Sequence, residues 1–151
     1  MQITRRHMLL GLTGVAGLAG AGYLLVPSRS GVGESARLDP VEAHRQALSG
    51  DILIVDIRRP DEWQRTGLGQ GAVPIDMRRK DFVDALLTEQ MKRGGLPVAL
   101  ICARGVRSRR VAFALAQANA GPIIDVPEGM LGSRAGPGWL KRKLPLVAWS
   151  G

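Results

Sequence analysis

An unbroken apolar run at residues 52–55 most restricts what this chain can fold into, and the run at residues 98–101 has the same strand character. A strand without any polar residue is buried on both faces, which is typical of a parallel sheet covered by helices. Along the chain, such runs alternate with segments whose apolar residues recur at helical spacing. This alternation predicts an α/β fold with a doubly wound parallel sheet.

Turn and cap signals divide the rest of the chain into elements. Asp39 followed by Pro40 is a helix start, because Asp caps free N–H groups and Pro suits the first helical position, and Gly50 ends that helix. The expected helices span residues 41–48, a short segment that includes Trp63, residues 80–91 and residues 108–118, and the expected strands span residues 52–55, 72–75, 98–101 and 123–126.

The only cysteine of the chain, Cys102, directly follows the run at 98–101, and the last predicted helix opens at Ser108. Ligands of open α/β sheets bind at the carboxyl ends of the strands. The N–H groups at a helix start attract an anion, so a thiol placed there should ionise more readily than a free one. Arg104 and Arg107 add positive charge to the same loop. Cys102 is therefore the predicted nucleophile.

Composition limits the partners and cofactors. The net charge is +8, but aromatic residues make up only 4% and no nucleic-acid recognition motif is present, which favours an anionic small substrate or a membrane surface over nucleic acid. One cysteine excludes an intramolecular disulfide and a zinc cluster built on cysteines. The two histidines, His7 in the N-terminal segment and His44 on a predicted surface helix, do not suggest a metal site. We expect no metal and no cofactor.

The N-terminal segment predicts export. Arg5 and Arg6 precede an uncharged stretch at residues 8–26, a pattern that resembles a twin-arginine export signal. A plain transmembrane anchor and a general secretory leader are the alternatives, since the stretch is about long enough to span a bilayer, which needs roughly 20 residues. In each case the paired arginines stay in the cytoplasm and the domain lies outside, in a bacterial periplasm or on the periplasmic face of the inner membrane.

These signals divide the chain into four parts. Residues 1–27 form the signal peptide or membrane anchor, and residues 28–35 form a linker of small residues. The domain spans residues 36–147, a common domain size, and residues 148–151 form a tail.

Four stretches resemble, in order, the motifs of the rhodanese family of sulfurtransferases. They are residues 53–58 with Pro60 and Glu62-Trp63, residues 71–75, the loop from Cys102 to Ser108, and Gly129-Met130 with Trp139 and Leu144-Pro145. One position departs from the family pattern, because Leu68 stands where the family usually has a histidine. The resemblance implies a parallel sheet flanked by helices on both faces.

The resemblance also implies a reaction. In the family, the cysteine takes sulfane sulfur from an anionic donor such as thiosulfate and becomes a persulfide. It then passes the sulfur to a thiophilic acceptor such as cyanide or a thiol. A protein acceptor is an alternative. Backbone N–H groups of the loop would hold the persulfide as a nest. The predicted substrate-binding residues are Ala103, Arg104, Gly105, Val106, Arg107, Ser108 and Arg58. For Arg58, the first interpretation is a structural ion pair with Asp56, and contact with the substrate is the second.

Two other functions remain open from the sequence. A cysteine-based phosphatase or arsenate reductase needs five residues between its cysteine and arginine, whereas four separate Cys102 from Arg107, and Ile101 precedes the cysteine where those enzymes have histidine. The shorter loop suits a single sulfur atom better than a phosphate. The other alternative is a membrane-tethered module that carries sulfur or binds a partner without turnover.

Overall fold

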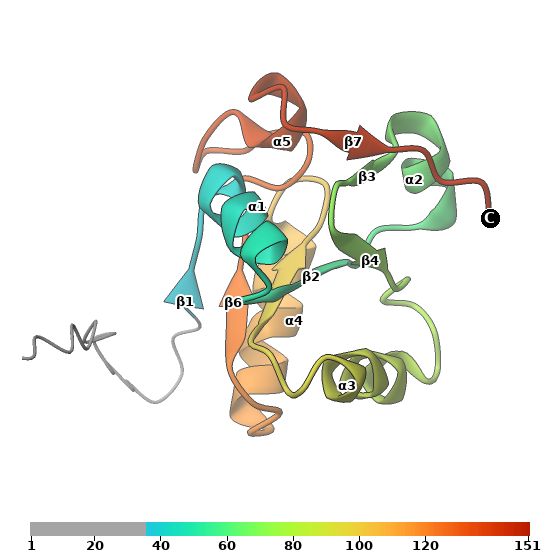
Figure 1. Cartoon of the computed structure of the whole chain (residues 1–151), viewed down its shortest axis with the longest axis vertical. Helices are drawn as coiled ribbons and strands as arrows, with labels where there is room; N and C mark the ends of the chain where they lie inside the picture. Colours follow the sequence, from blue (N-terminus) through green and yellow to red (C-terminus); the bar gives the residue numbers. More distant parts are fainter. Residues whose placement is uncertain (1–35) are drawn as a thin grey trace, which may run out of the picture.

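The computed structural model describes residues 36–151 (Figure 1). The predicted leader at residues 1–27 and the linker at residues 28–35 lie outside the described residues. Within the described part, no helix is both long enough and apolar enough to cross a membrane.

A five-stranded sheet forms the centre of the domain, and each pair of neighbouring strands is parallel. The strand order is β1, β6, β5, β2 and β4. Their bounds are β1 (Ala36–Arg37), β6 (Ile123–Asp125), β5 (Val98–Ile101), β2 (Leu53–Asp56) and β4 (Ala72–Pro74). Both β2 and β5 are buried along their whole length. The structure therefore confirms the parallel α/β sheet that the apolar runs predict.

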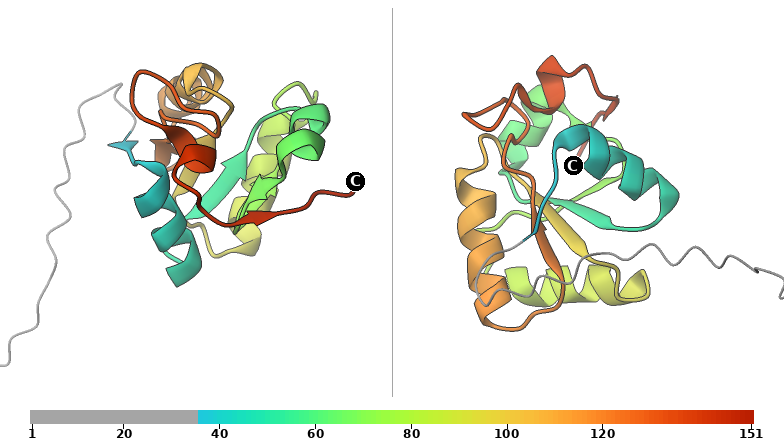
Figure 2. Two further views of the ribbon diagram at one scale, coloured as in Figure 1. Left: turned by 90° about the horizontal axis from the view of Figure 1, so that it is seen from above. Right: turned by 90° about the vertical axis from the view of Figure 1, so that its left-hand side faces the viewer.

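Helices cover both faces of this sheet, as predicted. Side chains alternate between the faces, so Val98 and Leu100 of β5 pack with α3 (Phe82–Lys92) and α4 (Val106–Gln117). The intervening strand residues pack with α1 (Pro40–Ser49) and the short α5 (Gly138–Lys141). Figure 2 shows α1 and α3 on opposite sides of the strands.

The first residues of α1 and α4 test the helix starts that were predicted from the sequence. In α1, the Asp39 side chain accepts hydrogen bonds from the N–H groups of Val41 at 2.8 Å and Glu42 at 3.1 Å, and Gly50 ends the helix at a φ of 79°. This confirms the predicted helix start. In α4, Gly105 takes the cap position without a side-chain cap, and the helix begins at Val106, two residues before the predicted Ser108.

A small second sheet is a feature that the sequence pattern did not predict. β3 (Leu68–Gly69) pairs antiparallel with β7 (Leu146–Val147), and α2 (Pro60–Thr66) precedes it. Leu68, which replaces the usual histidine of the family, pairs with Val147 and is 7% exposed. It therefore acts as a buried apolar residue of this sheet.

Candidate active site

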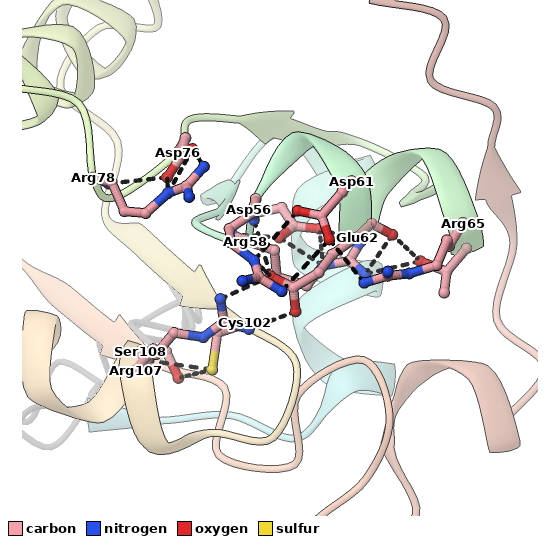
Figure 3. Close-up of polar contacts among 12 residues, drawn as sticks. Asp56, Arg58, Asp61, Glu62, Arg65, Asp76, Arg78, Cys102, Arg107 and Ser108 are labelled. Atoms are coloured by element: carbon pink, nitrogen blue, oxygen red, sulfur yellow. Dashed lines mark hydrogen bonds and ion pairs between the residues drawn. The ribbon is translucent and has the colours of Figure 1, made fainter.

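Cys102 lies at the carboxyl end of the central strand β5, between the ends of β2 and β6 (Figure 3). The residue is 1% exposed. Asp56 ends β2 on one side and Asp125 ends β6 on the other, and both side chains are buried. The register of the three strands therefore brings a thiol and two carboxyl groups to one edge of the sheet.

Ser108, in the first turn of α4, is the nearest polar neighbour of the sulfur. Its backbone N–H donates to the Cys102 Sγ at 3.4 Å, and the Cys102 thiol donates to its Oγ at 3.6 Å. The Ser108 hydroxyl also donates to the Gly105 carbonyl at 3.3 Å. The start of α4 is thus fixed directly against the sulfur, as the strand, loop and helix pattern predicts.

The loop backbone between Cys102 and α4 turns its first carbonyls away from the sulfur. The carbonyls of Cys102 and Ala103 accept hydrogen bonds from the N–H groups of Met130 and Leu131, each at 2.8 Å. The N–H groups from residue 103 to residue 107 have no hydrogen-bond acceptor within residues 36–151. A run of free N–H groups at a helix start is a suitable site for an anion.

Two glycines allow the loop and the segment after β6 to approach each other. Gly105 has a φ of 75°, and a Cβ there would lie 1.9 Å from the Pro127 carbonyl oxygen. Gly129 has a φ of 67°, and its Cβ would lie 2.6 Å from the Ala103 carbonyl oxygen. Any side chain at either position would push the loop out of place, since only glycine adopts such backbone angles freely.

Arg107 extends from α4 toward Glu62 of α2 (Figure 3). Its two terminal nitrogens donate to the Glu62 carboxylate at 2.8 and 2.6 Å. This contact is the main cause that lowers the pKa of Glu62 to about 2. The same contact raises the pKa of Arg107, and the nearby Cys102 sulfur adds to that rise. Arg107 therefore lies between a carboxylate and the sulfur, and the sequence analysis did not foresee the role of Glu62.

Arg58 belongs to a buried structural network. It is 1% exposed, and its guanidinium donates to both oxygens of Asp56 at 2.7 to 2.9 Å. Its remaining donors meet the Thr66 hydroxyl and the Gly67 carbonyl, each at 2.8 Å, and the more distant Glu62 carbonyl. All its N–H groups are thus used by the protein, which is the structural interpretation of this residue.

The other predicted loop residues divide between the inside and the outside of the loop. Ala103 and Gly105 are buried, whereas Arg104 and Val106 are exposed. Arg104 lines two hollows on the outer side of the loop, one of them shared with Lys141 and the other with Asp125.

Asp125 is a candidate that sequence reasoning missed. It is fully buried, and neither of its carboxyl oxygens has a partner with hydrogen-bond geometry among residues 36–151. Burial raises the pKa of Asp125, while the neighbouring Ser108 hydroxyl and the charges of Arg37 and Arg109 oppose that rise. The only sequence signal for Asp125 was a charged residue within the otherwise apolar strand predicted at residues 123–126.

Comparisons with known proteins place this site in a family. Residues 39–132 match the family model described as the rhodanese-like domain. A search of curated proteins found no match. Among solved structures, the polysulfide-sulfur transferase homodimer of Wolinella succinogenes is 23% identical, with a TM-score of 0.56, over 77% of this chain and 80% of that chain.

Two further structures have the same fold. Rv0390 from M. tuberculosis is 24% identical, with a TM-score of 0.56, over 76% of this chain and 98% of that chain. RPA3614 from Rhodopseudomonas palustris, described as a possible tyrosine phosphatase, is 22% identical, with a TM-score of 0.53, over 75% of this chain and 85% of that chain. The matched residues include the whole loop from Cys102 to Ser108. The chain belongs to the rhodanese-like domain family.

Proposed function

We propose that the protein is a sulfurtransferase that moves sulfane sulfur from thiosulfate, through a persulfide on Cys102, to a thiophilic acceptor. One observation carries the proposal: the Cys102 sulfur lies at the helix start beside the run of free N–H groups from residue 103 to residue 107. Such groups stabilise negative charge without supplying or removing a proton. The nucleophile and the sulfur carrier are then the same atom.

The first half of the reaction loads the cysteine. The Cys102 thiolate attacks the outer sulfur of thiosulfate, a new S–S bond forms, and the S–S bond of the donor breaks with its electron pair leaving on sulfite. The positive charges of Arg104 and Arg107 favour a dianionic donor and a departing anion. The Glu62 contact holds the guanidinium of Arg107 on this side of the loop.

The proposal includes export. The N-terminal pattern at residues 1–27 supports a domain that works in a bacterial periplasm or on the periplasmic face of the inner membrane, attached through residues 8–26 where the leader is retained. In such an oxidising compartment, a single cysteine has no internal partner for a disulfide.

A cyanolysis assay tests the sulfur transfer. The full-length protein is supplied with thiosulfate and cyanide, and thiocyanate is measured over time, with mercaptopyruvate as a parallel donor. We expect thiocyanate from the wild-type protein and none above background from Cys102→Ala. Ser49→Ala, at the exposed end of α1, serves as the matched control and retains activity. Full activity in Cys102→Ala would disprove the assignment.

A carrier or docking module without turnover is the second candidate. The low exposure of Cys102, 1%, is the observation in its favour, because a buried sulfur is difficult for substrates to reach. A protein that forms a persulfide on Cys102 but releases no thiocyanate with either donor would support this module.

The third candidate, a phosphatase, is tested with p-nitrophenyl phosphate. The four-residue spacing between Cys102 and Arg107 predicts no hydrolysis above the level of Cys102→Ala. Hydrolysis that depends on Cys102 would favour the phosphatase over the sulfurtransferase.

A further inference from the structure

A hollow lies on the outer side of the loop from Cys102 to Ser108, and its lining combines loop residues of the mechanism above with arginines that the mechanism does not use. Its volume is about 520 Å³, and Arg104, Gly105 and Val106 of the loop line one side of it. Arg37, Arg109 and Arg134 line it from the other sides, and Asp125 lies in its wall. Four arginines and one carboxyl group therefore meet around one cavity.

These arginines differ from the others of the domain. Most arginines of residues 36–151 contact a carboxylate, as Arg45 contacts Glu42 and Arg142 contacts Glu128. In that same part of the chain, the guanidinium groups of Arg104, Arg109 and Arg134 form neither a hydrogen bond nor an ion pair. Like charges that gather without a partner repel each other, and an anion bound between them removes that repulsion.

The buried Asp125 distinguishes this cavity from an exposed patch of charged side chains. Its carboxyl group is fully buried and lacks a hydrogen-bond partner among the described residues, yet it forms part of the cavity wall. The charges of Arg37 and Arg109, which line the same cavity, favour the ionised form of this carboxyl group. Even with Asp125 ionised, the four arginines leave the lining with a positive net charge.

The size and position of the cavity select the ligand. A volume of about 520 Å³ lies within the usual range for small-molecule sites, roughly 300–1,000 Å³, and is far larger than thiosulfate requires. Cys102 does not line the cavity, so a molecule bound there lies across the loop from the sulfur. A ligand with carboxylates for the arginines and a flexible arm for the sulfur satisfies both conditions.

We propose that this cavity binds the carboxylates of the sulfur acceptor, a low-molecular-weight thiol that carries at least two carboxylate groups. The inference rests on the proposed sulfur transfer. The acceptor thiolate attacks the outer sulfur of the Cys102 persulfide and forms a new S–S bond. The original S–S bond breaks, its electron pair returns to Cys102 as the thiolate, and the acceptor leaves as a persulfide. No external oxidant or reductant takes part.

A comparison of two acceptors tests the site. With thiosulfate at saturation, kcat/KM is measured for glutathione, which has two carboxylates, and for 2-mercaptoethanol, which has none. In the Arg109→Ala/Arg134→Ala double variant, we expect the ratio of the two values to fall about tenfold, which is the loss of ~1.4 kcal/mol of binding free energy for the carboxylates. Arg65→Ala, an exposed arginine of α2, is the matched control and leaves the ratio unchanged.

Two kinetic outcomes would overturn the inference. One is an unchanged ratio in the double variant, which is also the result expected if the arginines bind an acidic protein. The other is an equal fall for both thiols, which would show general damage to the enzyme rather than the loss of a carboxylate site.

A binding measurement separates this inference from the sulfur transfer itself. S-methylglutathione, which cannot accept sulfur, is titrated into the full-length wild-type protein, Cys102→Ser and the double variant by calorimetry. We expect binding to the first two proteins and at least tenfold weaker binding to the double variant. If binding follows this expectation but no sulfur transfer is detected, the proposed function is rejected and the carboxylate site is supported. If the wild-type protein does not bind S-methylglutathione, the carboxylate site is rejected.

Discussion

The two sides of Cys102 use the same kinds of residue in opposite ways. On the β2 side, the buried Asp56 meets Arg58, and Glu62 meets Arg107, so each charge has a partner. On the β6 side, the buried Asp125 has no hydrogen-bond partner among residues 36–151, and the side chains of Arg104, Arg109 and Arg134 form no ion pair there. The comparison indicates that charges on the first side stabilise the fold, whereas charges on the second side remain available for a ligand.

The largest effect is expected from Asp56→Asn. The change leaves the Arg58 guanidinium buried without its counter-charge, which costs about 3–5 kcal/mol of the free energy of unfolding. Urea denaturation monitored by tryptophan fluorescence measures this loss. Asp81→Asn removes the partner of the exposed Arg79 and serves as the control, with a much smaller expected loss because solvent screens that pair. Equal losses in the two variants would show that Asp56 does not have the structural role assigned to it.

A smaller effect, with a distinct pH dependence, is expected from Glu62→Gln. Arg107 lowers the pKa of Glu62 from 4.5 to about 2, so the ionised form is favoured in the folded protein. The stabilisation is fully present above pH 4.5 and is lost as the pH falls toward 2. Because Arg107 is partly exposed to solvent, we expect a loss of only about 1–2 kcal/mol at pH 7.

The check on this prediction is the stability difference between the wild-type protein and Glu62→Gln, measured by denaturation from pH 7 to pH 2. The difference should shrink as the pH falls below 4.5. Asp61→Asn, which removes the partner of the exposed Arg65, is the control and should give a much smaller difference. A difference that is constant with pH would rule out the ion pair as its source.

Asp125→Asn should raise the free energy of unfolding at pH 7, whereas Glu62→Gln lowers it. Burial raises the pKa of Asp125, so the folded protein binds this proton more tightly than the unfolded chain does. Stability therefore falls as the pH rises from 3.8 through the raised pKa of the folded state. Asparagine carries no charge, and the variant should be more stable at pH 7 by on the order of 1 kcal/mol.

Thermal or urea denaturation below pH 3.8 and at pH 7 measures this gain, which should be larger at pH 7. Asp125→Asn also sharpens the contrast with Asp56→Asn, since the same chemical change destabilises one side of Cys102 and stabilises the other. A loss of several kcal/mol in Asp125→Asn would mean that Asp125 has a structural partner and that the two sides do not differ.

The sequence was sufficient for the sheet, its covering helices and the position of Cys102 at the end of a central strand. The runs at residues 52–55 and 98–101 predict buried strands because burial on both faces requires apolar residues throughout. The start of α1 follows from the local hydrogen bonds of Asp39. Such features depend on neighbours in the chain, and a pattern can therefore reveal them.

Other features depend on contacts between distant residues. β1, β3 and β7 have two residues each, which is too short for any periodic pattern. The contact between Glu62 and Arg107 joins residues 45 positions apart. The sequence predicts only that Arg109 belongs to the helix at residues 108–118, and the packing of α4 against β6 places it in the cavity wall with Asp125. The sequence could not supply these tertiary contacts.

The central claim, that Cys102 carries the transferred sulfur, is tested most directly by intact-protein mass spectrometry. The full-length protein is incubated with thiosulfate, and the excess donor is removed. The intact mass is then measured before and after addition of cyanide. We expect a mass gain of one sulfur atom that disappears with cyanide as thiocyanate forms, and no gain in Cys102→Ser. A wild-type protein that gains no sulfur, or a Cys102→Ser variant that gains it equally, would contradict the account.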